Sequence, residues 1–147
     1  MMNEVAIERL IPHRDRMKLI DSIVQIDDHA AVTASKVTRQ WPLLEGHRVN
    51  PLVLLELIAQ TSAVTIGWKK LQEDGDAESG KGWLVGIKAA DFPDVDIPVN
   101  AHITTRSEIN FTMDNYTEMH GISTIGSERI GEATLQVMRA EKEDAGE

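Results

Sequence analysis

The feature that most constrains this fold is a long apolar stretch in the first half of the chain, EGHRVNPLVLLELIAQTSAVTIGW, at residues 45–68. From Leu52 to Trp68 the apolar residues fall on every side of a helical wheel, which is typical of a helix that other structure surrounds. Asn50 can cap such a helix with its side-chain oxygen, and Pro51 suits the first helical position. The sequence therefore predicts one buried central helix that begins at Asn50 and Pro51.

Two polar side chains interrupt this helix. Glu56 and Gln60 are four residues apart, so they share one helical face. Burying a carboxylate among leucines is costly unless the carboxylate is paired or functional, and perturbed carboxylates concentrate at active sites. We therefore expect Glu56 to be functional and Gln60 to support it or the backbone. The alternative is a structural carboxylate that binds loop amides and locks the helix.

Composition excludes several classes of protein. The chain has 147 residues, which predicts one domain over residues 1–147, long enough to bury about two thirds of its unfolded surface. Its net charge of −9 argues against nucleic acid or an anionic membrane as the main partner. It has no cysteine, which excludes disulfides, thiolate metal sites and cysteine nucleophiles.

Neither the N-terminal segment nor the central helix indicates a membrane protein. The N-terminal segment MMNEVAIERLIPHRD lacks the apolar core of a signal peptide, so the expected location is cytoplasmic. The central helix approaches membrane-spanning length, but it contains five polar residues, which are costly within a bilayer: Glu56, Gln60, Thr61, Ser62 and Thr65. We therefore expect no membrane span.

No motif points to a metal or a nucleotide. His29, His102 and His120 are spread over a turn and two strands without the local spacing of metal ligands. Neither a glycine-rich phosphate loop nor a G-x-S-x-G elbow occurs in the sequence. We therefore expect no metal and no cofactor.

Most of the remaining chain predicts strands. Residues 1–17 lead into the domain with a short helical turn at 3–10, residues 41–49 are expected to be irregular, and residues 72–81 form a charged loop. Residues 140–147 form a frayed tail. The strand candidates are bounded by Pro, Gly, Asn and Asp, and they lie at residues 17–26, 30–37, 82–92, 101–110, 116–125 and 128–139. Short turns favour antiparallel pairing, and an apolar helix needs a curved sheet around it, so the predicted class is α+β.

Five segments, in this order and spacing, resemble the hotdog-fold 3-hydroxyacyl-ACP dehydratases. They are LIPHRDRMKLID at 10–21, EGH at 45–47, ELIAQ at 56–60, GWLVGIK at 82–88 and GEATLQVM at 131–138. The chain is most similar to a small branch with a shortened loop, also found beside lipid and aryl polyene synthesis genes. The pattern V-x-x-E-x-x-A-Q of that branch falls on Val53, Glu56, Ala59 and Gln60. The resemblance implies a hotdog fold, in which a curved antiparallel sheet wraps one long central helix.

The resemblance also implies a reaction and its residues. Such enzymes eliminate water from a 3-hydroxyacyl thioester on acyl carrier protein or CoA, in fatty-acid or polyene synthesis and without a cofactor. The reaction needs a base for the α-proton and an acid for the leaving hydroxyl. By resemblance His47 is the base and Glu56 the acid or water-orienting group, supplied by different subunits of a homodimer or a larger assembly.

Further residues are expected to bind substrate. Arg48 can pair with Glu56 of a partner subunit or bind a phosphopantetheine phosphate, and Gln60 supports Glu56. Gly86 lets an extended substrate approach the backbone, or else marks a bulge. Backbone amides, often at a helix N-terminus, would bind the thioester carbonyl, although Pro51 removes one of them.

The loop HRVNP at 47–51 departs from the parent enzymes, because it is shorter and lacks the glycine of their turn. Three functions therefore stay open at this point. The protein is a dehydratase, a thioesterase whose carboxylate activates water, or a non-catalytic acyl-binding subunit of a mixed hotdog dimer. His13 and Arg14 are expected to anchor the N-terminal loop or the dimer.

Overall fold

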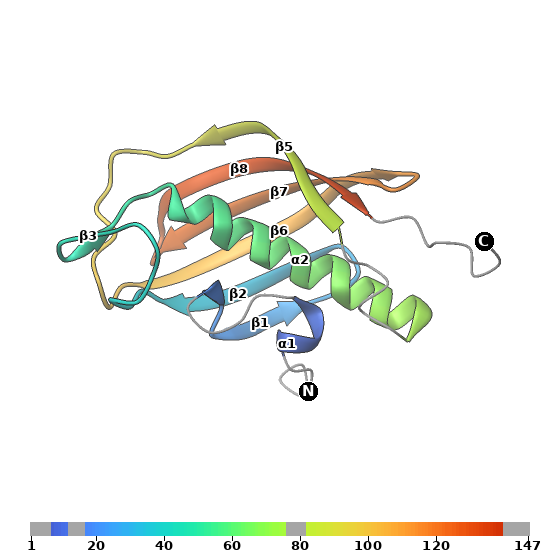
Figure 1. Cartoon of the computed structure of the whole chain (residues 1–147), viewed down its shortest axis with the longest axis horizontal. Coiled ribbons are helices and arrows are strands. Elements are labelled where there is room, and N and C mark those ends of the chain that lie inside the picture. Colours follow the sequence, from blue (N-terminus) through green and yellow to red (C-terminus); the bar gives the residue numbers. More distant parts are fainter. Residues whose placement is uncertain (1–6, 12–16, 76–81, 140–147) are drawn as a thin grey trace.

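The computed structural model describes residues 7–11, 17–75 and 82–139. Six strands form one antiparallel sheet in the order β1-β2-β6-β7-β8-β5, and the long helix α2 crosses one face of it (Figure 1). A two-stranded ribbon, β3-β4, precedes the helix. The elements are α1 (Ile7–Leu10), β1 (Ser22–Ile26), β2 (Ala30–Lys36), β3 (Leu44–Glu45), β4 (Arg48–Val49), α2 (Val53–Asp74), β5 (Gly82–Asp91), β6 (His102–Met113), β7 (Tyr116–Ile125) and β8 (Glu128–Arg139).

The predicted α+β class and antiparallel pairing are confirmed, but the predicted bounds of the helix are wrong at both ends. The helix begins at Val53 rather than at Asn50 and Pro51. It ends at Asp74, so residues 72–74 of the loop predicted at 72–81 are helical. Five of the last six residues, KKLQED, are charged or polar, yet most of the six are good helix formers, so the helix continues through them. It stops at Gly75, whose left-handed backbone (φ 72°) suits glycine.

The segment expected to be irregular, residues 41–49, contains the hairpin β3-β4. Leu44 pairs with Val49 and Glu45 with Arg48, which leaves a two-residue turn between the strands. Gly46 begins that turn with a φ of 67°, a conformation that glycine adopts without strain. The hairpin lies at the end of the molecule where α2 begins (Figure 1).

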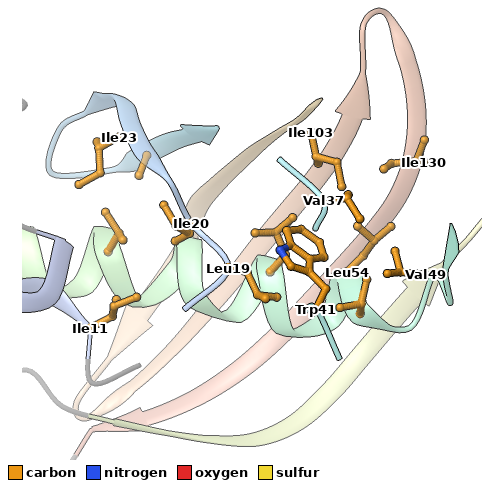
Figure 2. Packing of buried hydrophobic residues seen from close by; sticks show 14 of the residues in the cluster. Ile11, Leu19, Ile20, Ile23, Val37, Trp41, Val49, Leu54, Ile103 and Ile130 are labelled. Carbon is orange, nitrogen blue, oxygen red and sulfur yellow. The ribbon is translucent and has the colours of Figure 1, made fainter. Parts of the chain in front are cut away.

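The helix is buried because its apolar side chains meet the sheet on one side and the N-terminal segments on the other. Leu54 and Leu57 are fully buried, and each contributes roughly 1.5–3 kcal/mol relative to an exposed position. Near the start of the helix, Leu54 packs close to Trp41 and Val37 (Figure 2). This packing joins the helix to the loop that carries the hairpin β3-β4.

Small residues on the sheet let the helix lie close to it. A Cβ atom added at Gly121 of β7 would overlap the side chain of Ile58. One added at Gly131 of β8 would lie 2.6 Å from Cδ1 of Leu54. Larger residues at either glycine would therefore push α2 away from the sheet.

Hydroxyl groups fill part of the same interface. Thr61 of α2 donates to the carbonyl of Leu57 at 2.9 Å, so its oxygen accepts the hydroxyl of Thr33 on β2, also at 2.9 Å. Ser62 lies 2.6 Å from Ser107 of β6. These buried bonds fix the position of the helix along the sheet. The hydroxyl residues also make the helix more polar. No helix in the described ranges is long and apolar enough to cross a membrane.

On the sheet face away from α2, one carboxylate joins three strands. Glu118 of β7 is only 8% exposed at its side chain, and it accepts hydrogen bonds from Asn110 of β6 at 2.9 Å and Lys88 of β5 at 3.1 Å. The bond from Asn110 and then the bond from Lys88 lower the pKa of Glu118 below its ordinary value of 4.5, while burial opposes them. Glu118 therefore stabilises the sheet in its ionised form.

We expect Glu118→Gln to remove a pH-dependent part of the stability. Because the folded pKa lies below 4.5, the contribution of the carboxylate is complete above the unfolded pKa and is lost as pH falls through the folded pKa. The difference in free energy of unfolding between wild type and Glu118→Gln should be larger at about pH 7 than at about pH 3, by urea titration. Glu108→Gln, at a half-exposed carboxylate of β6, is the control for removing a less buried charge. A difference that is equal at both pH values contradicts the prediction.

Candidate active site

Glu56 lies in the first turn of α2, half-buried, where the partial positive charge of the helix start stabilises a carboxylate. Its Oε1 accepts a hydrogen bond from Nε2 of Gln60 at 3.0 Å. The two residues share one helical face, as their spacing predicts. The sequence therefore places a carboxylate and its amide partner on a rigid element.

Gln60 is fully buried, and its amide joins three parts of the chain. Besides Glu56, Nε2 binds the carbonyl of Met17 at 2.5 Å, and Oε1 accepts the amide of Leu19 at 2.9 Å. The predicted support of Glu56 and of the backbone is thus observed. A contact of Gln60 with substrate stays a prediction. These bonds hold residues 17–19 on the helix, which explains why β1 begins at Ser22 and not at Met17.

His47 lies in the turn between β3 and β4 and is exposed. Its Nδ1 lies 2.9 Å from Nη2 of Arg39, and its carbonyl accepts the amide of Val99 at 2.8 Å. Within one chain, no hydrogen bond joins His47 to Glu56 in the residues that the structure describes. The catalytic role of both residues stays a prediction, and its cross-subunit form is compatible with this separation.

Arg48 binds Asp96, which is not one of its expected partners. Its Nη1 donates to Oδ1 of Asp96 at 2.8 Å, and the two side chains are 62% and 75% exposed. An exposed pair of this kind contributes at most about 1 kcal/mol, so a phosphate or a partner carboxylate can displace Asp96 at small cost. The predicted binding role of Arg48 stays a prediction.

Gly86 lies beside a bulge in β5, where the register shifts between Leu84 and Gly86. The side-chain amide of Gln136 on β8 occupies the space that a Cβ atom would take. The alternative of a bulge-forming glycine is therefore observed. A substrate contact at Gly86 stays a prediction.

The amides at the start of α2 are occupied, which corrects an expectation from the sequence. The Oδ1 of Asn50 accepts a backbone amide, as expected, but that amide belongs to Leu52 (3.0 Å) in a turn before the helix, and the N-cap position is Leu52. The carbonyl of Asn50 accepts the amide of Val53 at 3.0 Å. Leu54 donates to the carbonyl of Pro51 at 3.0 Å. Because Pro51 follows Asn50, the chain closes a tight turn that uses these amides before the helix begins. They are therefore not free to bind a thioester carbonyl in this conformation.

Arg39 and Asp96 complete the surroundings of the hairpin, and no motif in the sequence indicated either of them. They contact His47 and Arg48 only because separate loops meet at this end of the sheet. Residues 12–16, with His13 and Arg14, lie outside the described residues, as does the tail at 140–147. In the described ranges, no group of three or more His, Asp or Glu side chains is placed to hold a metal ion.

A curved antiparallel sheet around one long helix defines a hotdog-fold protein, and solved structures agree with this class. The chain superposes on the dehydratase heterocomplex ApeI:P from Xenorhabdus doucetiae with a TM-score of 0.81 and 19% identity, over 94% of this chain and 93% of that one. It superposes on a hypothetical thioesterase with coenzyme A from Streptococcus pneumoniae with a TM-score of 0.67 and 14% identity, over 84% and 88%. These likenesses confirm the predicted hotdog fold.

The family follows from sequence. The ApeP-like family model, described as ApeP dehydratase, matches residues 5–146, and the chain belongs to this family. The 3-hydroxyacyl-[acyl-carrier-protein] dehydratase FabZ of Anaeromyxobacter dehalogenans is 28% identical over 149 residues, covering 97% of this chain and 94% of that protein. The FabZ of Oceanobacillus iheyensis is 35% identical over 99 residues, covering 63% and 66%. The resemblance to hotdog dehydratases is confirmed, and the protein is a dehydratase-like hydro-lyase by family.

We expect Gln60→Leu to destabilise the fold, because the buried amide of Leu19 loses its acceptor while the side-chain volume changes little. One unsatisfied buried amide costs about 1–3 kcal/mol, which urea unfolding at neutral pH would resolve. The control is Gln72→Leu, at an exposed position of the same helix, where the change should stay within about 0.5 kcal/mol. Equal stability of both variants would show that Gln60 does not anchor the segment before β1.

Proposed function

We propose that this protein eliminates water from 3-hydroxyacyl thioesters to give trans-2-enoyl thioesters, in fatty-acid or polyene-type synthesis. The observation that carries the proposal is a half-buried carboxylate, Glu56, held on a rigid helix in a chain whose family match spans residues 5–146. The FabZ relatives are named for acyl-carrier-protein substrates, which supports a carrier-bound thioester, with CoA as the alternative. A cytoplasmic location is part of the proposal.

Glu56 and His47 are the groups that we propose for the chemistry. One proton must leave the α-carbon and one must reach the departing hydroxyl. Since the two side chains are not bonded within one chain, we propose that a second subunit brings His47 to Glu56. We propose that Arg48, which lies beside His47 in the same hairpin and pairs with Asp96 at the surface, binds the phosphate of the substrate carrier.

The edge strand β5 supports an assembly through the sheet. β5 pairs only with β8, so its other edge has no strand beside it in the described part of the chain. That strand carries exposed large apolar residues, including Trp83, Val85 and Ile87. A long apolar edge of this kind is a template for pairing with another strand. We propose that two copies pair through β5.

A mixed assembly is the second candidate, and the similarity to a chain of the ApeI:P heterocomplex favours it. In that case this chain lends Glu56 or Arg48 to a histidine-bearing hotdog subunit. The thioesterase alternative has only the fold likeness to thioesterases in its support, which does not extend to activity. The products distinguish dehydration from thioester hydrolysis, and a requirement for a second hotdog protein distinguishes the mixed assembly.

We expect the wild type to form an enoyl thioester from a 3-hydroxyacyl carrier-protein substrate, and Glu56→Gln to lose at least about 100-fold in kcat, as general acid–base groups contribute on this scale. His47→Ala should also lower kcat. The measurement is ultraviolet absorbance of the enoyl thioester, with free thiol followed in parallel. Gln72→Leu, on the exposed side of α2, is the matched control.

Thiol release without enoyl product supports the thioesterase. Activity that appears only after a second hotdog protein is added supports the mixed dimer.

We expect Val85→Lys to convert the dimer to a monomer, because a lysine on the edge strand opposes pairing with a second chain. Light scattering after size exclusion measures the mass. Val24→Lys is the matched control: Val24 is 58% exposed and Val85 57%, each lies at a bulge, and they occupy the opposite edge strands β1 and β5. Dissociation of the Val24→Lys variant alone would place the interface at β1.

A further inference from the structure

Five large apolar side chains lie together on the outer face of the sheet, which is the face away from α2. The strand register places four of them in one row across β6, β7, β8 and β5: Met113, Tyr116, Met138 and Trp83. The fifth, Phe111, lies opposite Glu118, and its ring centroid is 5.6 Å from that of Tyr116. Because Tyr116 and Glu118 are two residues apart on β7, they share the outer face. We call these five apolar residues the outer patch.

The outer patch is open to solvent in the single chain. Met113 is 64% and Trp83 62% exposed, and Phe111 is also exposed. Large apolar side chains grouped on one surface mark a contact with another molecule. The patch lies near the turn between β6 and β7, at the opposite end of the sheet from the hairpin β3-β4 (Figure 1). A partner bound there leaves the candidate active site open.

Charged side chains on the rest of the outer face neutralise one another. Four carboxylates there contact a cation within 3.2 Å, and the pairs are Glu118 with Lys88, Glu108 with Arg106, and both Asp91 and Glu132 with Arg129. The whole chain carries a net charge of −9, so two copies repel each other. That repulsion is reduced where the charges are paired, and the outer face is therefore suited to a second copy of the same chain.

Pairing through β5 would bring two outer patches onto one surface. Two antiparallel β5 strands are related by a twofold axis perpendicular to the sheet, which keeps both outer faces on the same side. A stable interface buries about 800 Å² on each partner, or about 20–30 residues, which is more than one patch of five side chains provides. The two patches of a dimer bind together, and so gain what one patch lacks.

We propose that the outer patch binds the outer patch of a second copy, so that two β5-paired dimers stack sheet against sheet as a tetramer. Sheets pack face to face at about 10 Å with their side chains interdigitated. An apolar patch is complementary to itself across a twofold axis, as such a contact requires. The net charge argues against an anionic membrane as the occupant. This inference rests on the pairing through β5 in the proposed function and not on the reaction.

Light scattering after size exclusion, over a series of protein concentrations, tests the stacking. The mass of the wild type should rise from two chains to four. Met113→Lys should stay at two chains, because burying an unpaired ammonium group in an apolar contact is costly. Val24→Lys, at a similarly exposed position of β1 (58% against 64%), is the matched control and should still reach four. A wild-type mass of two chains at every concentration overturns the proposal.

Val85→Lys separates this contact from the other parts of the proposed function. The variant should be a monomer throughout, because one patch alone is too small to hold two chains. If Val85→Lys forms a dimer that Met113→Lys then abolishes, the outer patch binds as proposed and the pairing through β5 is wrong. A wild type that reaches four chains without dehydratase activity refutes the proposed reaction and supports the contact.

Acrylamide quenching of tryptophan fluorescence shows whether the patch itself becomes covered. Trp83 is exposed, whereas Trp41 is buried and Trp68 is partly buried. Quenching of the wild type should fall as the tetramer forms, and neither Met113→Lys nor Trp83→Phe should show this fall. A tetramer that is quenched as strongly as the dimer overturns the proposal. Protection that appears only with phosphatidylcholine vesicles, at a mass of two chains, indicates a lipid surface and overturns it as well.

Discussion

The structure depends on burying one helix whose residues 53–68 have apolar side chains on every side. The sheet covers only one side of α2, so other segments have to cover the rest. α1 does so at Gly67, where an added Cβ atom would lie 2.7 Å from the carbonyl oxygen of Leu10, and the loop with Trp41 covers the start of the helix. The close approach needs small residues on the sheet, at Gly121 and Gly131. The fold is therefore specified by size at the helix–sheet interface as well as by hydrophobicity.

The polar residues of α2 are tolerated because each has a defined partner. Thr61 and Ser62 bond to hydroxyls of the sheet, and Gln60 bonds to the backbone of the segment before β1. The same amide of Gln60 orients Glu56. A residue that stabilises the fold thus also holds the carboxylate of the candidate site, and stability and the proposed function are joined on one turn of the helix.

The candidate site is divided between two kinds of structure. Glu56 lies on a rigid helix, whereas His47 and Arg48 lie in a short hairpin at the end of the sheet, with Arg39 and Asp96 as neighbours. Among the described residues of one chain, no hydrogen bond joins His47 to Glu56. The chemistry that we propose therefore depends on assembly, and the exposed side chains of the hairpin are the ones that we propose to meet a second subunit.

The sequence by itself determined the fold class, the central helix, the strands at 116–125 and 128–139, and the pairing of Glu56 with Gln60, because periodicity, turn residues and helical spacing are local. Tertiary structure decided the rest. The charged end of α2 continues as helix to Gly75, the hairpin β3-β4 forms where the carbonyl of His47 binds Val99, and Gln60 finds Leu19, which is 41 residues away. Contacts between distant segments, such as that of Arg39 with His47, depend on how the core brings loops together, and no local pattern encodes them.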